Sequence, residues 1–284
     1  MPQGRTLSLS FPPFTKAVKW LVLTNAGVYL LITILRVAMP EVGDLLYFGL
    51  LPLKPQMVMH GWIWQIGTYA FVHAGIWHLF FNMLALWMFG AQLETDWGLK
   101  HFLEFYSFCV AGAAITTILV SYSGIGGISP LTPTVGASGG IYGILMAFGL
   151  LYGEREIMLF PIPFTIKAKY FVAGIAFIAL VSAISAAAPG KGESIAYFAH
   201  LGGLLFGFFY IKFLPRKGLA FGASEQYFGF RNSYYRWKRK RAARKFEVYM
   251  RKHDRTVTFD EHGNYIPPDD NEKKNGGSKS GWVN

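Results

Sequence analysis

The sequence predicts an all-α membrane protein, a bundle of six transmembrane helices with a short central fourth helix. Composition is the first observation: charged residues make up 15% of the 284 residues and hydrophobic residues 52%. Soluble domains carry about 25% charged residues, so the composition argues against a soluble protein. Apolar stretches are the second observation, because a helix needs about 20 such residues to cross a bilayer. They cover roughly 18–38, 72–91, 99–121, 137–153, 168–188 and 195–214.

The distribution of Lys and Arg between the connecting segments predicts the orientation. The N-terminal segment, the region around Lys100, the 154–167 loop and the C-terminal tail hold nearly all of them, whereas the loops of the other side carry only Lys54 and Lys191. Since basic loops stay in the cytoplasm, we expect both termini there. The short N-terminus, without a transit-like segment, favours a bacterial inner membrane. The predicted division is a cytoplasmic segment 1–16, a six-span domain 17–214 and a tail 215–284.

The fourth apolar stretch is unusually short. It has 16 residues from Ala137 to Tyr152, about 24 Å of helix against a hydrocarbon core of about 30 Å. Gly and Pro interrupt the preceding segment 123–136, and non-helical backbone at membrane depth is tolerated only where protein or a wet cavity receives it. We therefore expect the fourth helix to begin below the surface, surrounded by the other five.

Polar residues inside the predicted spans are costly and indicate function by default. His78 and Asn82 in the second span are four positions apart and share a helix face. Ser138 opens the fourth span, and His200 lies near the start of the sixth. Under the predicted orientation, these groups lie at the same depth near the external surface.

These residue types can perform acyl transfer together. Free N–H groups and the positive dipole end at a helix N-terminus can stabilise an oxyanion beside Ser138. His200 can take the serine proton and give it to a leaving amine, while His78 and Asn82 can add donors. Each motif alone more often reflects helix packing, and His78 with Asn82 can simply join helices. Their conjunction at one depth favours a serine hydrolase.

These motifs resemble those of the rhomboid family of intramembrane serine proteases. The resemblance covers roughly residues 15–214 and includes Glu94-x-x-Trp97-Gly98 at the inner end of the second span. Its central motifs are His73 with His78-x-x-x-Asn82, Gly136-Ala137-Ser138-Gly139 with Tyr142, and Ala199-His200-x-x-Gly203-x-x-x-Gly207.

The resemblance implies a role for each matching residue. Ser138 is the nucleophile and His200 the general base and acid, a dyad without a carboxylate. The Ser138 N–H, His78 and Asn82 form the oxyanion hole, and Tyr142 supports the His200 ring. The other motif residues have structural roles near the site: Gly136, His73, Gly139, Gly203 and Gly207. The implied substrates are single-span membrane proteins, cut at a small residue, with the 188–194 loop as a cap.

No cofactor and no metal site are expected, since Cys109 is the sole cysteine. The chain departs from the family in one respect: the first external segment, 39–71, has no Trp-Arg pair, and Trp62-Ile63-Trp64-Gln65 is the nearest match. This departure concerns the anchoring of the segment along the membrane interface. The alternative functions are a catalytically silent relative that binds transmembrane segments and a small transporter. A transporter favours two interrupted helices, whereas this chain has one.

The tail holds 16 of the 27 Lys and Arg, seven of them between Arg236 and Lys245. This run predicts a surface segment attracted to anionic lipid head groups. Nucleic-acid binding is not expected, because no base-stacking platform accompanies the run. From Asp260 onward the polar composition favours disorder.

Overall fold

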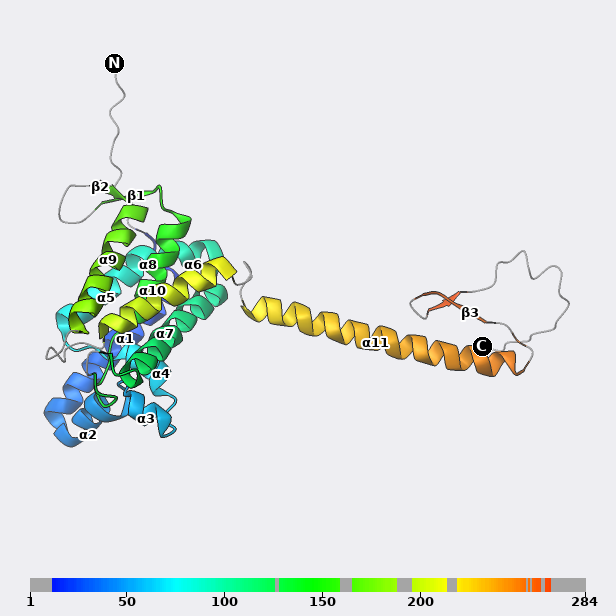
Figure 1. Cartoon of the computed structure of the whole chain (residues 1–284), viewed down its shortest axis with the longest axis horizontal. Coiled ribbons are helices and arrows are strands. Elements are labelled where there is room, and N and C mark those ends of the chain that lie inside the picture. The colour runs from blue at the N-terminus through cyan, green and yellow to red at the C-terminus, as the bar shows by residue number, and fades with distance from the viewer. Residues whose placement is uncertain are drawn as a thin grey trace, which may run out of the picture. The chain divides into compact units, whose positions relative to one another are not determined.

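The computed structural model describes residues 12–125, 128–158, 165–187, 196–213, 219–253, 255, 257–261 and 264–266. The described residues are mostly helical, and the chain divides into two compact units, Met1–Gly218 and Leu219–Asn284 (Figure 1). The predicted cap loop, 188–194, lies outside the described residues.

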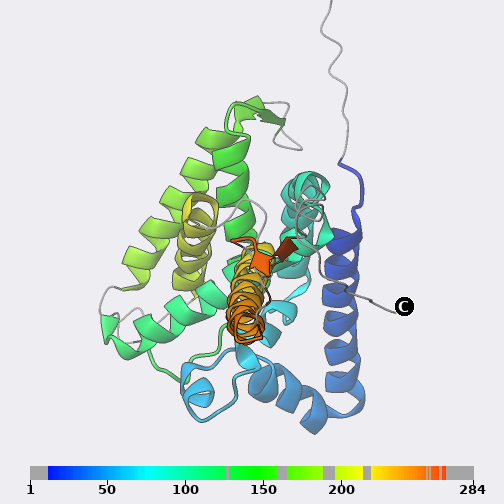
Figure 2. The same ribbon diagram turned by 90° about the vertical axis from the view of Figure 1, so that its right-hand side faces the viewer.

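Five helices in the first unit are long and apolar enough to cross a membrane. They are α1 (Lys16–Ala38), the continuous helix Ile76–Trp97, α7 (Leu99–Tyr122), α9 (Ala168–Ala186) and α10 (Ala196–Phe213). Ile76–Trp97 comprises α5 (Ile76–Ala85), a wider turn η3 (Leu86–Gly90) and α6 (Ala91–Trp97). Figure 2 shows the dark-blue α1 along one edge of this unit and the yellow-green α9 along the opposite edge. The prediction of a helical, multi-pass membrane protein is confirmed.

The second span is displaced from its predicted bounds of 72–91. The chain is extended at Val72 and Gly75, so the helix begins at Ile76, and it continues to Trp97. Glu94, which lies beyond the predicted bounds of this span, is 5% exposed. Its carboxylate accepts hydrogen bonds from the backbone N–H groups of Ala17 (2.6 Å) and Val18 (2.9 Å) and from the Thr15 hydroxyl. The charge therefore belongs inside the bundle, where it caps the first turn of α1.

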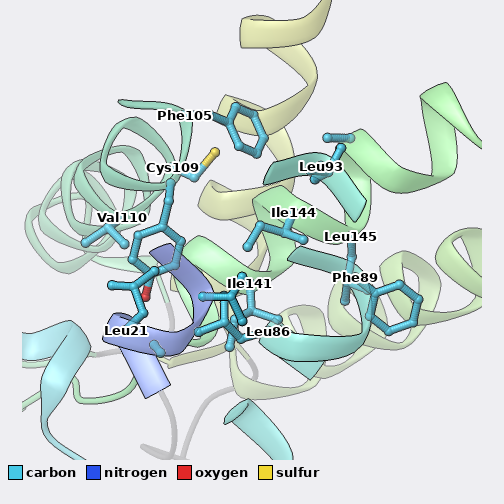
Figure 3. Packing of buried hydrophobic residues seen from close by; sticks show 14 of the residues in the cluster. Leu21, Leu86, Phe89, Leu93, Phe105, Cys109, Val110, Ile141, Ile144 and Leu145 are labelled. Atoms are coloured by element: carbon cyan, nitrogen blue, oxygen red, sulfur yellow. The ribbon is translucent and has the colours of Figure 1, made fainter. Parts of the chain in front are cut away.

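The short helix α8 (Ser138–Leu151) lies among longer ones. Its 14 residues give about 21 Å of helix, less than the hydrocarbon thickness of about 30 Å. Eight of these residues are buried, and α8 packs mainly against α7, α10 and α9. Ile141 and Ile144 of α8 lie in the main apolar cluster with Leu86, Phe105 and Cys109 (Figure 3). The buried residues begin at Gly139, directly after Ser138, so the polar N-terminal end of α8 is packed against its neighbours.

The segment 39–71, which the sequence predicts to be external, contains five short helical pieces and is held by side chains of its own. They are α2 (Pro40–Asp44), η1 (Leu45–Leu50), α3 (Pro55–Met59), α4 (Gln65–Thr68) and η2 (Tyr69–Phe71). Gln65 is fully buried; its amide donates to the Gly49 carbonyl and accepts from the Lys54 N–H, each at 3.0 Å. The Trp64 indole N–H donates to the Leu50 carbonyl at 3.0 Å. Trp64 and Gln65 therefore anchor the segment that lacks a Trp-Arg pair.

A small antiparallel hairpin connects α8 to α9. It consists of β1 (Glu156–Met158) and β2 (Thr165–Lys167). Glu154 forms ion pairs with Lys167, at 2.8 Å, and with Lys169. Hydrogen bonds from these two ammonium groups lower the pKa of the exposed Glu154 carboxyl to about 2. This connection therefore keeps its charges paired well below neutral pH.

The described residues of the second unit form a long helix and a short hairpin. The helix α11 (Leu219–Arg251) has 33 residues, and β3 (Thr258–Phe259) pairs with β4 (Tyr265–Ile266). The second strand of this hairpin lies in the region from Asp260 onward, where the sequence favours disorder. Asp260 closes its turn by accepting bonds from the backbone and side-chain N–H groups of Asn264, at 2.8 and 2.9 Å. Phe259 packs edge-on against Phe246 of α11, with ring centroids 6.3 Å apart.

Candidate active site

Ser138 and His200 meet at the N-terminal ends of two adjacent helices. Ser138 is the first residue of α8, and His200 lies in the second turn of α10. The Nε2 atom of His200 is 2.9 Å from Oγ of Ser138, a hydrogen-bonding distance. Both side chains are half-buried. The structure thus brings together a hydroxyl and an imidazole that are 62 positions apart in the chain.

Glycines allow the two helices to come this close. A Cβ atom on Gly203 of α10 would overlap the carbonyl oxygen of Gly139 in α8. One turn further, a Cβ on Gly207 would lie 2.8 Å from the Cα of Gly143. Real Cβ atoms need more room than this, so the backbones approach at a distance that only glycine permits. This contact sets the separation on which the Ser138–His200 hydrogen bond depends.

The ring of Tyr142 lies flat against the His200 ring. Their centroids are 4.2 Å apart and their planes differ by 3°. Tyr142 is four positions after Ser138, hence one turn further along the same face of α8. Tyr142 therefore fixes the plane of the imidazole from the helix that carries Ser138.

His78 lies next to Ser138, over Gly136. A Cβ on Gly136 would be 2.8 Å from Cε1 and 2.9 Å from Nε2 of His78, and 3.7 Å from Oγ of Ser138. The φ angle of Gly136 is +118°, a conformation that other residues rarely adopt. The backbone N–H of Ala74 donates to Nδ1 of His78 at 3.3 Å. In the neutral ring this leaves the proton on Nε2, the nitrogen on the side of Ser138.

The other two residues of the His73/His78/Asn82 motif occupy different positions. Asn82 is buried, and its amide donates to the His78 carbonyl one turn earlier, at 2.9 Å. No hydrogen bond joins it to Ser138 within the described residues. His73 precedes the second helix instead of belonging to it, is 2% exposed, and has its ring centroid 5.1 Å from that of His78. A cavity of about 410 Å³ borders His73, lined also by residues of α1, α2 and η1.

Two contacts that the sequence did not predict position the segment before Ser138. The buried Tyr69 accepts the Gly136 N–H on its carbonyl at 2.9 Å, and its hydroxyl donates to the Val110 carbonyl at 2.8 Å. Leu53 and Thr134 exchange both backbone hydrogen bonds, at 3.0 and 2.9 Å. These pairings join segments more than 40 positions apart, and no local pattern in the sequence indicates them.

A metal site is not evident: within the part of the chain that the structure describes, no three His, Cys, Asp or Glu side chains are grouped to hold an ion. The available chemistry is that of a hydroxyl, two imidazoles and the N–H groups at the start of α8.

The family model for the rhomboid domain matches residues 60–217, more than half of the chain. The chain belongs to the rhomboid family. Rhomboid protein 1, mitochondrial, from Saccharomyces cerevisiae is 34% identical over 145 residues, covering 50% of this chain and 39% of the relative. Rhomboid protease GluP from Bacillus subtilis is 35% identical over 171 residues, covering 58% and 29%. RHOMBOID-like protein 1 from Arabidopsis thaliana is 32% identical over 157 residues, covering 55% and 36%.

The rhomboid match contains the whole candidate site. It includes the start of α8, the start of α10 and the segment from His73 to Asn82. The chain spans about two fifths or less of the length of each of these relatives. The unit Leu219–Asn284 lies beyond the rhomboid match.

Proposed function

We propose that this chain is an intramembrane serine endopeptidase in which Ser138 and His200 form the catalytic dyad. The observation that carries the proposal is the 2.9 Å approach of His200 Nε2 to Ser138 Oγ, with the imidazole stacked on Tyr142. The names of the relatives support it, because the Bacillus subtilis protein is named a rhomboid protease. A serine needs an adjacent base of this kind to become nucleophilic at neutral pH.

In the proposed reaction, Ser138 Oγ attacks the carbonyl carbon of the scissile peptide while its proton passes to His200 Nε2. The tetrahedral intermediate collapses when the same nitrogen gives that proton to the departing amine, leaving an acyl-enzyme on Ser138. Water then loses a proton to His200, attacks the ester carbonyl and releases the second product as Ser138 regains its proton. The imidazole plane must stay fixed through both steps, which the Tyr142 stack favours.

Two hydrogen-bond donors can stabilise the developing oxyanion. One is the backbone N–H of Ser138, which has no partner within the helix because Ser138 is its first residue. The other is Nε2–H of His78, since Nδ1 of that ring already accepts the Ala74 N–H. Asn82 acts in this proposal through the helix turn that carries His78, because its amide bonds to the His78 carbonyl.

The substrates that fit this site are transmembrane segments of single-span membrane proteins. The site lies at the start of a helix shorter than the hydrocarbon core, among five helices that are long enough to cross it. If α8 and its preceding segment together form a sixth crossing, both termini lie on the same side of the membrane. The concentration of Lys and Arg on that side assigns it to the cytoplasm. We propose a cytoplasmic location for both termini, a site open to the external face, and the bacterial inner membrane as the host.

The test is cleavage of a generic single-span substrate by the purified full chain in liposomes. We expect a discrete product from wild type and none from Ser138→Ala, which loses one half-buried hydroxyl and keeps the fold. A fluorophosphonate should label wild type at Ser138, and His200→Ala should suppress that labelling. Cleavage by Ser138→Ala at the wild-type rate would contradict the dyad.

A second candidate function is a catalytically silent relative that binds transmembrane segments. It is favoured if neither cleavage nor fluorophosphonate labelling occurs in a wild-type protein shown to be folded. Labelling without cleavage instead indicates a protease of narrow specificity. The two functions are thus separated by the reactivity of Ser138 itself, independently of the choice of substrate.

A further inference from the structure

The exposed helix α11 carries two different faces along its second half. Positions 234, 237, 241, 244 and 248 recur every three or four residues and form one face, and positions 239, 243, 246 and 250 form the opposite one. The second face is in contact with the hairpin: Ala243 is buried, and Phe246 packs against Phe259. The first face is exposed along its whole length.

The exposed face combines aromatic and cationic side chains. The rings of Tyr234 and Trp237 stack with centroids 6.1 Å apart, and the Arg241 guanidinium lies 5.3 Å from the centre of the Trp237 ring. Arg244 and Val248 continue this face. Tyr234, Trp237 and Val248 each expose half or more of their surface. Aromatic and apolar side chains interleaved with Arg on one helix face are typical of helices that lie in a membrane interface.

The positive charge of this region is not neutralised locally. Seven Lys and Arg lie between positions 236 and 245, with no acidic residue among them. Among the described residues, none of these seven forms an ion pair, whereas Arg251 does pair with Glu247, at 3.4 Å. A surface of this charge attracts a polyanion. The exposed aromatic side chains favour a polyanion that also has an apolar region, and an anionic bilayer has both.

We infer that the face of α11 formed by Tyr234, Trp237, Arg241, Arg244 and Val248 docks on the surface of a bilayer that contains anionic phospholipids. The chain itself keeps this face near a membrane, since its first residue, Tyr234, follows the last residue of the span α10 by 21 positions. The Lys and Arg contact the head-group phosphates, and Trp237 and Val248 enter the boundary with the acyl chains. The hairpin occupies the other face, so docking on the bilayer does not require it to leave.

The experiment uses the full chain in lipid nanodiscs with an environment-sensitive fluorophore at Val248→Cys. The native Cys109 is completely buried, so the chain without the added cysteine serves as the labelling control. In nanodiscs with about 30% phosphatidylglycerol we expect blue-shifted emission that quenchers placed in the acyl chains reduce. In pure phosphatidylcholine, or at high salt, the shift should disappear. The same fluorophore at Ala242→Cys, away from the docking face, should respond weakly.

Two double variants with equal loss of charge test the face itself. R241Q/R244Q removes two charges from the docking face, and K238Q/R239Q removes two from elsewhere on the helix. We expect the first to reduce the docked-to-free ratio about tenfold or more, and the second to reduce it much less. Equal losses would overturn the assignment to this face. A larger response to added RNA than to phosphatidylglycerol would overturn the choice of partner. Neither the fluorescence measurement nor the comparison of the double variants depends on cleavage by Ser138, so the result is independent of the proposed function.

Discussion

The ring of Tyr142 is parallel to the ring of His200 within 3°, at a centroid distance of 4.2 Å. Tyr142 and Ser138 occupy successive turns of the same helix, and His200 comes from another. One face of α8 therefore determines both the position of the hydroxyl and the plane of the imidazole that bonds to it. Relative movement of the two helices would change the hydrogen bond and the ring stack together.

Replacing Tyr142 tests this stack. Tyr142→Phe keeps an aromatic ring, so we expect cleavage and fluorophosphonate labelling within about twofold of wild type. Tyr142→Ala removes ring contacts of about 0.5–1.5 kcal/mol, which corresponds to a loss of about two- to tenfold in rate. Labelling rates of both variants in detergent micelles measure the effect. A loss in Tyr142→Phe as large as in Tyr142→Ala would assign the effect to the hydroxyl instead.

Gly136 is expected to be essential for reactivity at Ser138, because the His78 ring packs directly against it. In Gly136→Ala the new methyl group meets the His78 ring, less than 3 Å away, and moves a proposed oxyanion donor. We predict a loss of about a hundredfold or more in the labelling rate of Ser138. Gly61→Ala is the matched control, since Gly61 also has a positive φ, +97°, but nothing lies within 4 Å of its added Cβ.

The control separates backbone strain from displacement of His78. Gly61→Ala should lower the melting temperature through strain of about 1 kcal/mol and leave the labelling rate near wild type. If the two variants lose the same reactivity, strain in a loop explains the result and His78 is not involved.

The sequence indicated a common depth for Ser138, His78 and His200, because helix periodicity relates position along the chain to direction and depth. The support of the His200 ring by Tyr142 was expected from the family resemblance alone, and the roles of these residues stay predictions. The contacts of Tyr69 with Gly136 and of Leu53 with Thr134 could not be predicted in this way. They involve backbone groups of irregular segments far apart in the chain, and backbone atoms carry no sequence signal.

The inner end of the second span could not be predicted from composition, because a carboxylate is buried there. The predicted bounds of 72–91 leave Glu94 out, but hydrogen bonds with the start of α1 satisfy it inside the bundle. The sequence also did not indicate how the segment 39–71 is held without a Trp-Arg pair; Trp64 and Gln65, at the nearest match, donate to backbone carbonyls. For Glu94 and for Trp64 with Gln65, the structural role depends on the hydrogen-bond partner, which composition does not reveal.

The glycine contact between α8 and α10 predicts unequal effects of two Gly→Ala changes. In Gly203→Ala the methyl group overlaps the Gly139 carbonyl, and overpacking of this kind costs about 1–3 kcal/mol. Gly174→Ala in α9 adds a methyl group with nothing within 4 Å and should stabilise that helix slightly. Thermal unfolding in micelles gives the stabilities, and fluorophosphonate labelling reports the Ser138–His200 separation. Equal melting temperatures for the two variants would show that the helices adjust freely.

The carboxylate of Glu94 is expected to be the main support of the N-terminal end of α1. Glu94→Ala leaves the Ala17 and Val18 N–H groups and the Thr15 hydroxyl without their acceptor, and each unsatisfied buried donor costs about 1–3 kcal/mol. We expect a loss of about 3 kcal/mol or more, measured by thermal unfolding in micelles. Glu94→Gln keeps one carbonyl acceptor and should lose less. Thr95→Ala changes the exposed neighbour and should stay within about 0.5 kcal/mol of wild type. If Glu94→Ala unfolds no earlier than Thr95→Ala, the buried carboxylate does not hold α1 in place.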